Sequence, residues 1–128
     1  MIADTSFLID LLTGDEDALK RTKEIENNRL EIATTTITVF EMWSSANIMT
    51  KQERDKLEEL FTRMRIETHD VATARDAGLL HAQLRSKGCE IGEMDCLIAS
   101  LCLRNNESLI TRNIKHFSRV QGLKIEEY

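Results

Sequence analysis

The chain has 128 residues, the size of one ordinary domain with a single hydrophobic core. Its hydrophobic content of 41% and charged content of 30% are typical of globular proteins and exclude a disordered chain or a coiled coil. The 17 Lys and Arg against 22 Asp and Glu give a formal net charge of -5, which excludes a non-specific DNA coat but not an enzyme whose carboxylates are screened by a metal ion.

The chain contains no proline, so glycines and polar clusters mark the boundaries of the predicted elements. In chain order we predict a strand at residues 1–3, helices at 6–12 and 15–28, a strand at 31–34, and helices at 35–49 and 51–65. A strand at 66–69, helices at 71–87 and 93–106, a strand at 107–111, a short segment at 113–117 and a strand at 123–126 follow. Short strands that alternate with helices predict one α/β domain over residues 1–128 with a mainly parallel sheet.

Within this pattern, Gly14 and Gly88 are expected to end helices, and Thr35 is expected to cap one. In parallel sheets the chemistry gathers beyond the carboxyl ends of the strands. Asp4 and Asn113 each follow a predicted strand, which makes them candidate site residues.

The sequence also bears on the compartment. Three cysteines at positions 89, 96 and 102 are odd in number and have no C-x-x-C spacing, which is typical of reduced core residues rather than disulfides or a zinc site. The first residues lack the basic flank of a signal peptide, and no uncharged stretch approaches the roughly 20 apolar residues of a membrane span. We therefore expect a cytoplasmic protein with no membrane segment.

Three carboxylates stand where the pattern favours apolar residues. Asp4 interrupts a strand-to-helix junction, Glu41 is the only charged residue between positions 32 and 50, and Asp95 shares its helix face with small and apolar residues. An isolated buried carboxylate is costly, whereas carboxylates gathered around a divalent cation are favourable oxygen ligands. Each also has a purely structural interpretation: Asp4 as a helix cap, Glu41 as the partner of a buried Arg, Asp95 at the positive end of its own helix. For all three together we favour a shared acidic site.

The segments MIADTSFLIDLL, ITVFEMW, IGEMDCLIAS and SLITRNIKHFSRVQGLKIEEY follow one another over nearly the whole chain. In order and spacing the chain resembles the PIN-domain ribonucleases, especially the VapC-type toxins of prokaryotic toxin–antitoxin pairs. The resemblance implies a three-layer α/β/α sandwich with a parallel sheet and a central acidic pocket. It also implies cleavage of single-stranded or loop RNA that depends on Mg²⁺ or Mn²⁺, with the metal supporting an activated water.

By motif position, the resemblance implies that Asp4, Glu41, Asp95 and Asn113 are the catalytic residues. Asp4 and Asp95 would bind the metal, with Glu41 as a further ligand. The fourth position is often Asp in the family, so the neutral Asn113 makes the pocket less negative. Its side chain either binds a water of the metal or caps the following turn.

Further residues have one functional and one structural interpretation each. Thr5 and Ser6 match the hydroxyl residues that bond the first carboxylate or a water of the metal, and Glu93 either reaches a second metal or simply opens a helix. Arg112 either contacts RNA phosphate or neutralises the acids, and His116 either touches a phosphate or is a plain surface residue.

We assign three remaining side chains to structure alone. Asp10 is expected on the solvent side of its helix, His81 packed within its helix and Phe117 in the core. His81 has no ligand partner in the sequence pattern.

The resemblance further implies a small cognate antitoxin whose C-terminal segment crosses the acidic pocket. The apolar stripes of helices 35–49 and 51–65 form a clamp for that segment, a homodimer face, or simply a contact between the two helices.

The leading hypothesis for activity is metal-assisted hydrolysis of phosphodiester bonds. A PIN-like domain that binds RNA or protein without cutting is an alternative, which the neutral Asn113 keeps open. A receiver-like phosphoacceptor domain would need an acidic pair after the first strand, where Asp4 stands alone.

Overall fold

The computed structural model describes all residues from 1 to 128. Its strands are β1 (Ile2–Ala3), β2 (Ala33–Thr35), β3 (Arg65–Glu67), β4 (Leu109–Ile110) and β5 (Ile125–Glu126). Its helices are α1 (Thr5–Thr13), α2 (Glu16–Asn27), α3 (Thr36–Trp43), α4 (Lys51–Thr62), α5 (Val71–Ser86), α6 (Glu93–Asn105) and α7 (Ile114–Phe117). Every predicted element is present, with most ends shifted by one or two residues.

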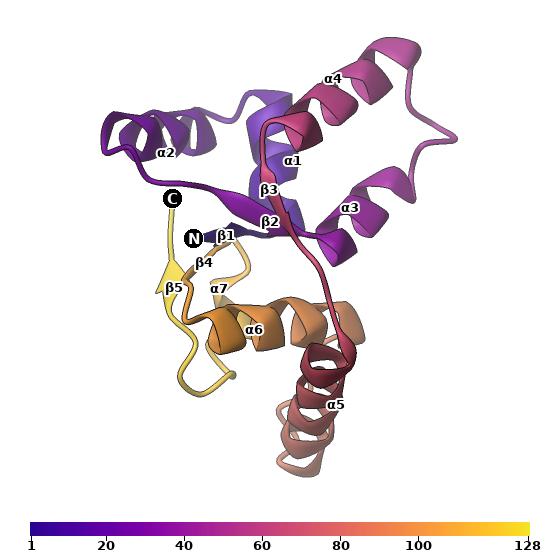
Figure 1. Ribbon diagram of the computed structural model, residues 1–128, viewed down its shortest axis with the longest axis vertical. Coiled ribbons are helices and arrows are strands. Elements are labelled where there is room, and N and C mark those ends of the chain that lie inside the picture. Colours follow the sequence, from indigo (N-terminus) through magenta and orange to yellow (C-terminus); the bar gives the residue numbers. More distant parts are fainter.

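The strands form one parallel sheet in the order β3-β2-β1-β4-β5 (Figure 1), which confirms the predicted α/β class. The two central strands are only two residues long, and their register pairs Ile2 with Leu109 and Ala3 with Ile110. Because successive strand residues point to opposite faces, each central strand gives one side chain to each side of the sheet. Both side chains are apolar and fully buried, as expected of a parallel sheet covered on both faces.

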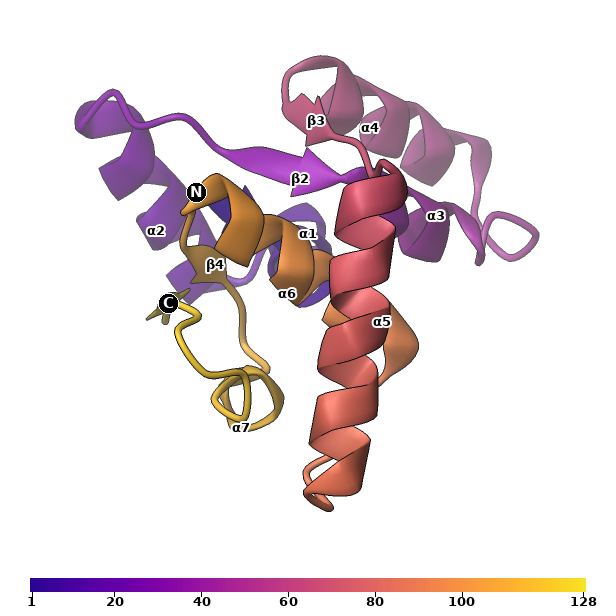
Figure 2. The same cartoon turned by 60° about the horizontal axis from the view of Figure 1, so that its bottom comes forward.

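Two hydrophobic clusters confirm the three-layer arrangement. Ile2 and Leu109 belong to a cluster with α5, α6 and α7, whereas Ala3 and Ile110 belong to a cluster with α1, α2 and α4. Figures 1 and 2 show the two groups of helices on opposite faces of the sheet. Phe117 is fully buried in the first cluster, as predicted.

Local signals fix several helix ends where the sequence predicts them. Gly14 ends α1 in the left-handed conformation with φ of 82°, and Gly88 follows α5 with φ of 66°. The side chain of Thr35 accepts a hydrogen bond from the N–H of Thr38 and so caps α3.

The predicted helix 35–49 is too long, because α3 ends at Trp43 and the chain continues in turns. The hydroxyl of Ser44 donates to the carbonyl of Glu41 at 2.6 Å, the kind of local bond by which serine competes with helical hydrogen bonds. This turn carries the chain from α3 to α4.

All cysteines are free, but only Cys96 and Cys102 are buried, so the prediction of a core position is wrong for Cys89. Burial, reinforced by nearby acids, raises the pKa of the Cys96 thiol to about 11. No helix of the chain is long and apolar enough to span a membrane.

Candidate active site

The candidate site lies where the connections of the sheet change direction. The chain leaves β1 into α1 on one face, whereas it leaves neighbouring β4 into α7 on the other face. Such a divergence opens a crevice at the carboxyl ends of the two strands. Asp4 follows β1 and Thr111 follows β4, so both side chains lie at this crevice.

Asp4 is held by three donors. Its Oδ1 accepts hydrogen bonds from the Phe7 N–H at 3.0 Å and the Ser6 hydroxyl at 2.8 Å, and its Oδ2 accepts one from the Thr111 hydroxyl at 2.6 Å. The Phe7 bond makes Asp4 the N-cap of α1, as its structural interpretation predicts. A carboxylate offers about four acceptor positions, so one on Oδ2 is left for a further partner.

The charge of Asp4 is disfavoured where it stands. Asp4 is only 5% exposed, and burial raises the pKa of its carboxyl above the ordinary value, while its hydrogen bonds act against this rise. The negative charge of Asp95 raises the pKa of Asp4 further. The two carboxylates therefore lie close enough to repel each other, and a cation between them would relieve that repulsion.

Glu41 reaches the same region from α3. The Thr5 hydroxyl donates to Glu41 Oε2, so the residue that follows Asp4 in the chain orients the second acid. The partner of Glu41 is thus a threonine rather than the buried Arg of the structural interpretation. Its side chain stays partly exposed.

Asp95 lies in the first turn of α6, where the helix dipole favours negative charge. Its side chain is 25% exposed, and His116 Nδ1 of α7 lies 3.5 Å from its Oδ2. The structure thus brings His116, with 46% of its side chain exposed, to the rim of the acidic site. Glu93, in the same turn, is exposed.

Asn113 occupies the N-cap position of α7, but its side chain makes no capping hydrogen bond. Its backbone N–H donates to the Thr111 hydroxyl at 2.9 Å. The same hydroxyl therefore accepts from Asn113 and donates to Asp4, which ties the fourth predicted position to the first.

Comparison with known proteins identifies the family of this fold. Residues 1–123 match the family described as PIN domain. The chain belongs to the PIN domain family.

Curated relatives extend the likeness over nearly the full length of both chains. Ribonuclease VapC2 of Rickettsia felis is 28% identical over 127 residues, which cover 98% of this chain and 95% of the relative. Ribonuclease VapC19 of Mycobacterium tuberculosis is 30% identical over 125 residues, which cover 96% of each.

Solved structures of toxin–antitoxin complexes have the same fold. VapBC2 from Rickettsia felis, bound to a DNA fragment from its promoter, matches with a TM-score of 0.87 and 26% identity over 99% of this chain and 97% of that chain. DNA-bound VapBC from Salmonella typhimurium also matches with a TM-score of 0.87, at 22% identity over 98% of this chain and 96% of that chain.

The carboxylate oxygens of this PIN domain's candidate site suit a divalent metal ion as ligands. However, no group of three or more His, Cys, Asp or Glu side chains is arranged to hold one unaided. Hard cations such as Mg²⁺ use one or two protein carboxylates and complete their shell with water and substrate oxygens. The buried charge of Asp4, its free acceptor position on Oδ2 and its repulsion by Asp95 fit such an ion.

Two interpretations of charged residues need correction. Asp10 is not on the solvent side of α1: it is 9% exposed, and its Oδ2 accepts a hydrogen bond from the Tyr128 hydroxyl at 2.6 Å. Arg112 does not neutralise the site acids, because its guanidinium lies 2.5 Å from Asp10 and 3.3 Å from Asp15. In both cases the partner is brought near by the fold and not by sequence spacing.

Thr111 is the site residue that the sequence reasoning missed. It is fully buried and bonds both Asp4 and Asn113. The available signal was its position, because a polar residue directly after a buried strand repeats the placement of Asp4 after β1.

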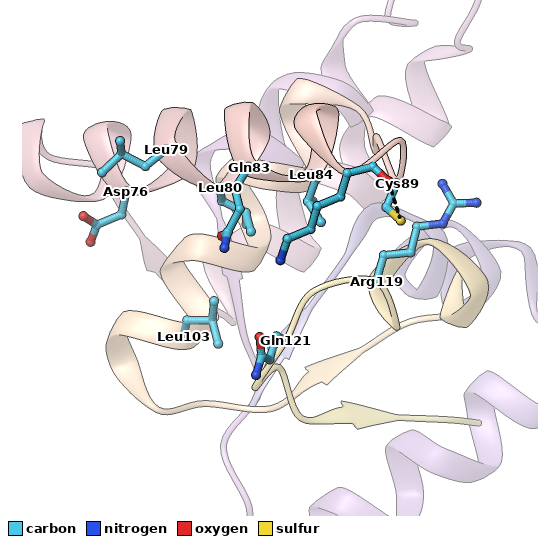
Figure 3. A pocket seen from close by; sticks show the side chains of 10 residues that line it. Asp76, Leu79, Leu80, Gln83, Leu84, Cys89, Leu103, Arg119 and Gln121 are labelled. Carbon is cyan, nitrogen blue, oxygen red and sulfur yellow. Dashed lines mark hydrogen bonds between the residues drawn. The ribbon is translucent and has the colours of Figure 1, made fainter.

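A groove of about 480 Å³ adjoins the site between α1, α3 and α4. It is lined by Ile9, Leu12, Thr13, Glu41, Met42, Ser45, Met49, Glu53, Lys56 and Leu57. A second hollow, of about 420 Å³, is shown in Figure 3, with leucines of α5 facing Leu103 of α6 and the segment after α7. None of the candidate site residues lines this second hollow.

Proposed function

We propose that this PIN domain is a divalent-metal-dependent endoribonuclease and the toxin of a VapBC-type toxin–antitoxin pair. The observation that carries the proposal is the buried Asp4, whose charge is opposed by Asp95 at the switch point of the sheet. The full-length ribonuclease relatives supply the substrate class.

Mg²⁺, for which Mn²⁺ can substitute, is the proposed metal, because the available donors are carboxylate and amide oxygens. Asp4 and Asp95 would hold it, with Glu41 as a further ligand. The bound ion would lower the pKa of an attacking water and stabilise charge on the phosphate.

The chain's own residues prepare the site for this reaction. The hydroxyls of Ser6 and Thr111 fix the Asp4 carboxylate, so the acceptor position that stays free on Oδ2 is already oriented before an ion binds. The Thr5 hydroxyl donates to Glu41 Oε2, which leaves Oε1 free to act as the further ligand of the metal. His116, exposed beside Asp95, would contact an RNA phosphate at the rim.

The groove between α1, α3 and α4 is the proposed seat of the antitoxin segment. Phe40 of α3 and Ile48 of the turn after it, at 60% and 80% exposure, are exposed apolar side chains within the predicted clamp of residues 35–49 and 51–65. Because Glu41 belongs to the lining of the groove, a basic side chain of a bound segment would reach the acidic site from there. A homodimer is the alternative use of this surface, and light scattering of the isolated chain would separate the two uses.

The test is cleavage of a single-stranded RNA and of a hairpin RNA with Mg²⁺, with Mn²⁺ and with chelator. We expect Asp4→Asn and Asp95→Asn to lower kcat by at least roughly 100-fold. Arg104→Gln is the matched control, because its ion pair with Asp76 at 2.5 Å lies on α5 and α6 away from the acids. Folded Asp4→Asn and Asp95→Asn proteins that cleave as fast as the parent would refute the proposal.

A second candidate function is binding of RNA or protein without cleavage. It is favoured by the neutral Asn113 and by the lack of three protein ligands arranged around one point. Isothermal titration that detects no Mn²⁺ binding at millimolar concentration, together with RNA binding and no cleavage, would favour this function over the first.

A further inference from the structure

A buried carboxylate outside the acidic site is held by two partners from the other end of the chain. Asp10 Oδ2 accepts a hydrogen bond from the Tyr128 hydroxyl at 2.6 Å and lies 2.5 Å from the Arg112 guanidinium. The Tyr128 ring also packs edge-on against Phe7 of α1, with ring centroids 4.8 Å apart. Burial and the Asp10 carboxylate raise the pKa of the Tyr128 hydroxyl, which therefore stays protonated and donating.

These contacts hold the segment after β4 against α1. Ser6 and Asp10 lie one helical turn apart on the same face of α1. Ser6 Oγ accepts the backbone N–H of Arg112 at 3.1 Å, and Asp10 takes the side chain of the same residue. Arg112 is thus fixed to α1 at its backbone and at its guanidinium.

The residues on either side of Arg112 belong to the candidate site. Thr111 donates to Asp4 Oδ2, and Asn113 follows at the fourth predicted position. Ser6, which accepts from Arg112, itself donates to Asp4 Oδ1 at 2.8 Å. Movement of the 111–113 segment away from α1 would therefore break the Thr111 bond to Asp4 Oδ2 and the Arg112 bond to Ser6, the residue that donates to Asp4 Oδ1.

We infer that Asp10, Arg112 and Tyr128 form a clamp that positions Asp4 and Asn113 for catalysis without touching substrate or metal. The expected effect of the clamp on kcat rests on the proposed nuclease function. Its effect on the position of the 111–113 segment rests on the contacts alone. The clamp should act on kcat, because small misplacements of catalytic groups by distant residues lower the rate of the chemical step.

Two mild variants test the clamp. Tyr128→Phe keeps the ring against Phe7 and removes only the hydroxyl. Asp10→Asn keeps the shape of the side chain and removes the nearer of the two carboxylate charges that Arg112 faces, while Asp15 stays in place. We expect each to lower kcat by roughly three- to tenfold while KM stays within about twofold, at temperatures well below unfolding. Arg104→Gln, which breaks a remote ion pair of similar length, should leave kcat unchanged.

A readout free of catalysis accompanies the kinetics. The backbone N–H of Arg112 is bonded to Ser6, so its hydrogen exchange reports directly whether the segment stays on α1. Exchange at Arg112 should be about tenfold faster in Tyr128→Phe and Asp10→Asn than in the parent, and unchanged in Arg104→Gln.

The outcomes separate the clamp from the nuclease proposal. If the parent cleaves RNA and both variants match it in kcat and in Arg112 exchange, the clamp is refuted and the nuclease function stands. If the parent cleaves no RNA, the nuclease proposal fails, and faster exchange at Arg112 still supports the clamp while unchanged exchange overturns it. A loss that appears only in KM would also overturn it, because that pattern indicates an RNA contact.

Discussion

Replacing Asp4 by Asn should abolish cleavage and at the same time stabilise the metal-free protein. Burial and the charge of Asp95 raise the pKa of the Asp4 carboxyl, so the folded state holds its charged form less well than water does. An amide keeps the cap, since Asn and Asp are equally good N-caps, and the Thr111 hydroxyl can rotate to accept from it. Removing such a strained functional charge commonly raises the free energy of unfolding by about 0.5–2 kcal/mol.

The pH dependence of this difference follows from the direction of the shift. A carboxyl whose pKa is raised above 3.8 on folding favours the folded state while protonated, and this contribution is lost as pH rises through the folded pKa. The gain from Asp4→Asn should therefore be absent below pH 3.8, grow as pH rises, and be complete once pH exceeds the pKa of Asp4 in the folded protein.

A divalent ion should reverse the order of stability. Ion at about 100 times its dissociation constant stabilises the parent by about 2.7 kcal/mol, and the variant, which lacks the ligand, by much less. Urea unfolding at pH 7, with chelator and with Mn²⁺, measures the gain from Asp4→Asn and the stabilisation by the ion. In a thermal melt, a difference of about 1 kcal/mol would appear as a shift of roughly 4 °C in Tm for a domain of this size. The reasoning is wrong if the variant is less stable than the parent in chelator, or if Mn²⁺ stabilises both equally.

Three further variants probe single contacts. Thr111→Val should lower the free energy of unfolding by about 1–3 kcal/mol in urea and lower kcat sharply, because it leaves the Asn113 N–H without its acceptor and Asp4 Oδ2 without its donor. An unchanged kcat would contradict the role of this hydroxyl. Asn113→Asp should tighten Mn²⁺ binding in isothermal titration, since it adds a carboxylate at the fourth position, and weaker binding would show that this side chain does not face the ion. Phe117→Ala should cost about 3–5 kcal/mol in urea unfolding because the ring is fully buried, and a much smaller loss would mean that the cavity collapses.

The sheet and the order of its helices could be predicted because their signals are local. Two-residue strands such as Ile2–Ala3 are recognisable when both residues are apolar and a polar residue follows. Helix ends at Gly14 and Gly88 follow from the left-handed conformation that glycine adopts readily. The end of α3 was not predicted, because the Ser44 hydroxyl donates to the backbone carbonyl of Glu41 and an apolar pattern does not reveal such a bond.

The candidate site was predictable only in part. A carboxylate such as Glu41 or Asp95 on an apolar stripe is visible in the sequence, and its role stays a prediction that the cleavage assays test. Thr111 and Asp10 were missed or misassigned because their partners are more than a hundred residues away in the chain. Helical periodicity alone placed Asp10 in solvent, whereas the fold sets that face of α1 against Arg112 and Tyr128.

The structural and functional interpretations of Asp4 are compatible, because they use different oxygens. Capping of α1 needs only Oδ1, which accepts the Phe7 N–H, and a neutral Ser or Asn would serve as well. A cap therefore does not explain why a full negative charge is buried within reach of Asp95, at a cost to stability. Oδ2 has no part in the cap, yet Thr111 fixes it and one acceptor position on it remains free. We propose that the charge of Asp4 serves what Oδ2 can bind, because a divalent cation shared with Asp95 would remove the cost of burying it.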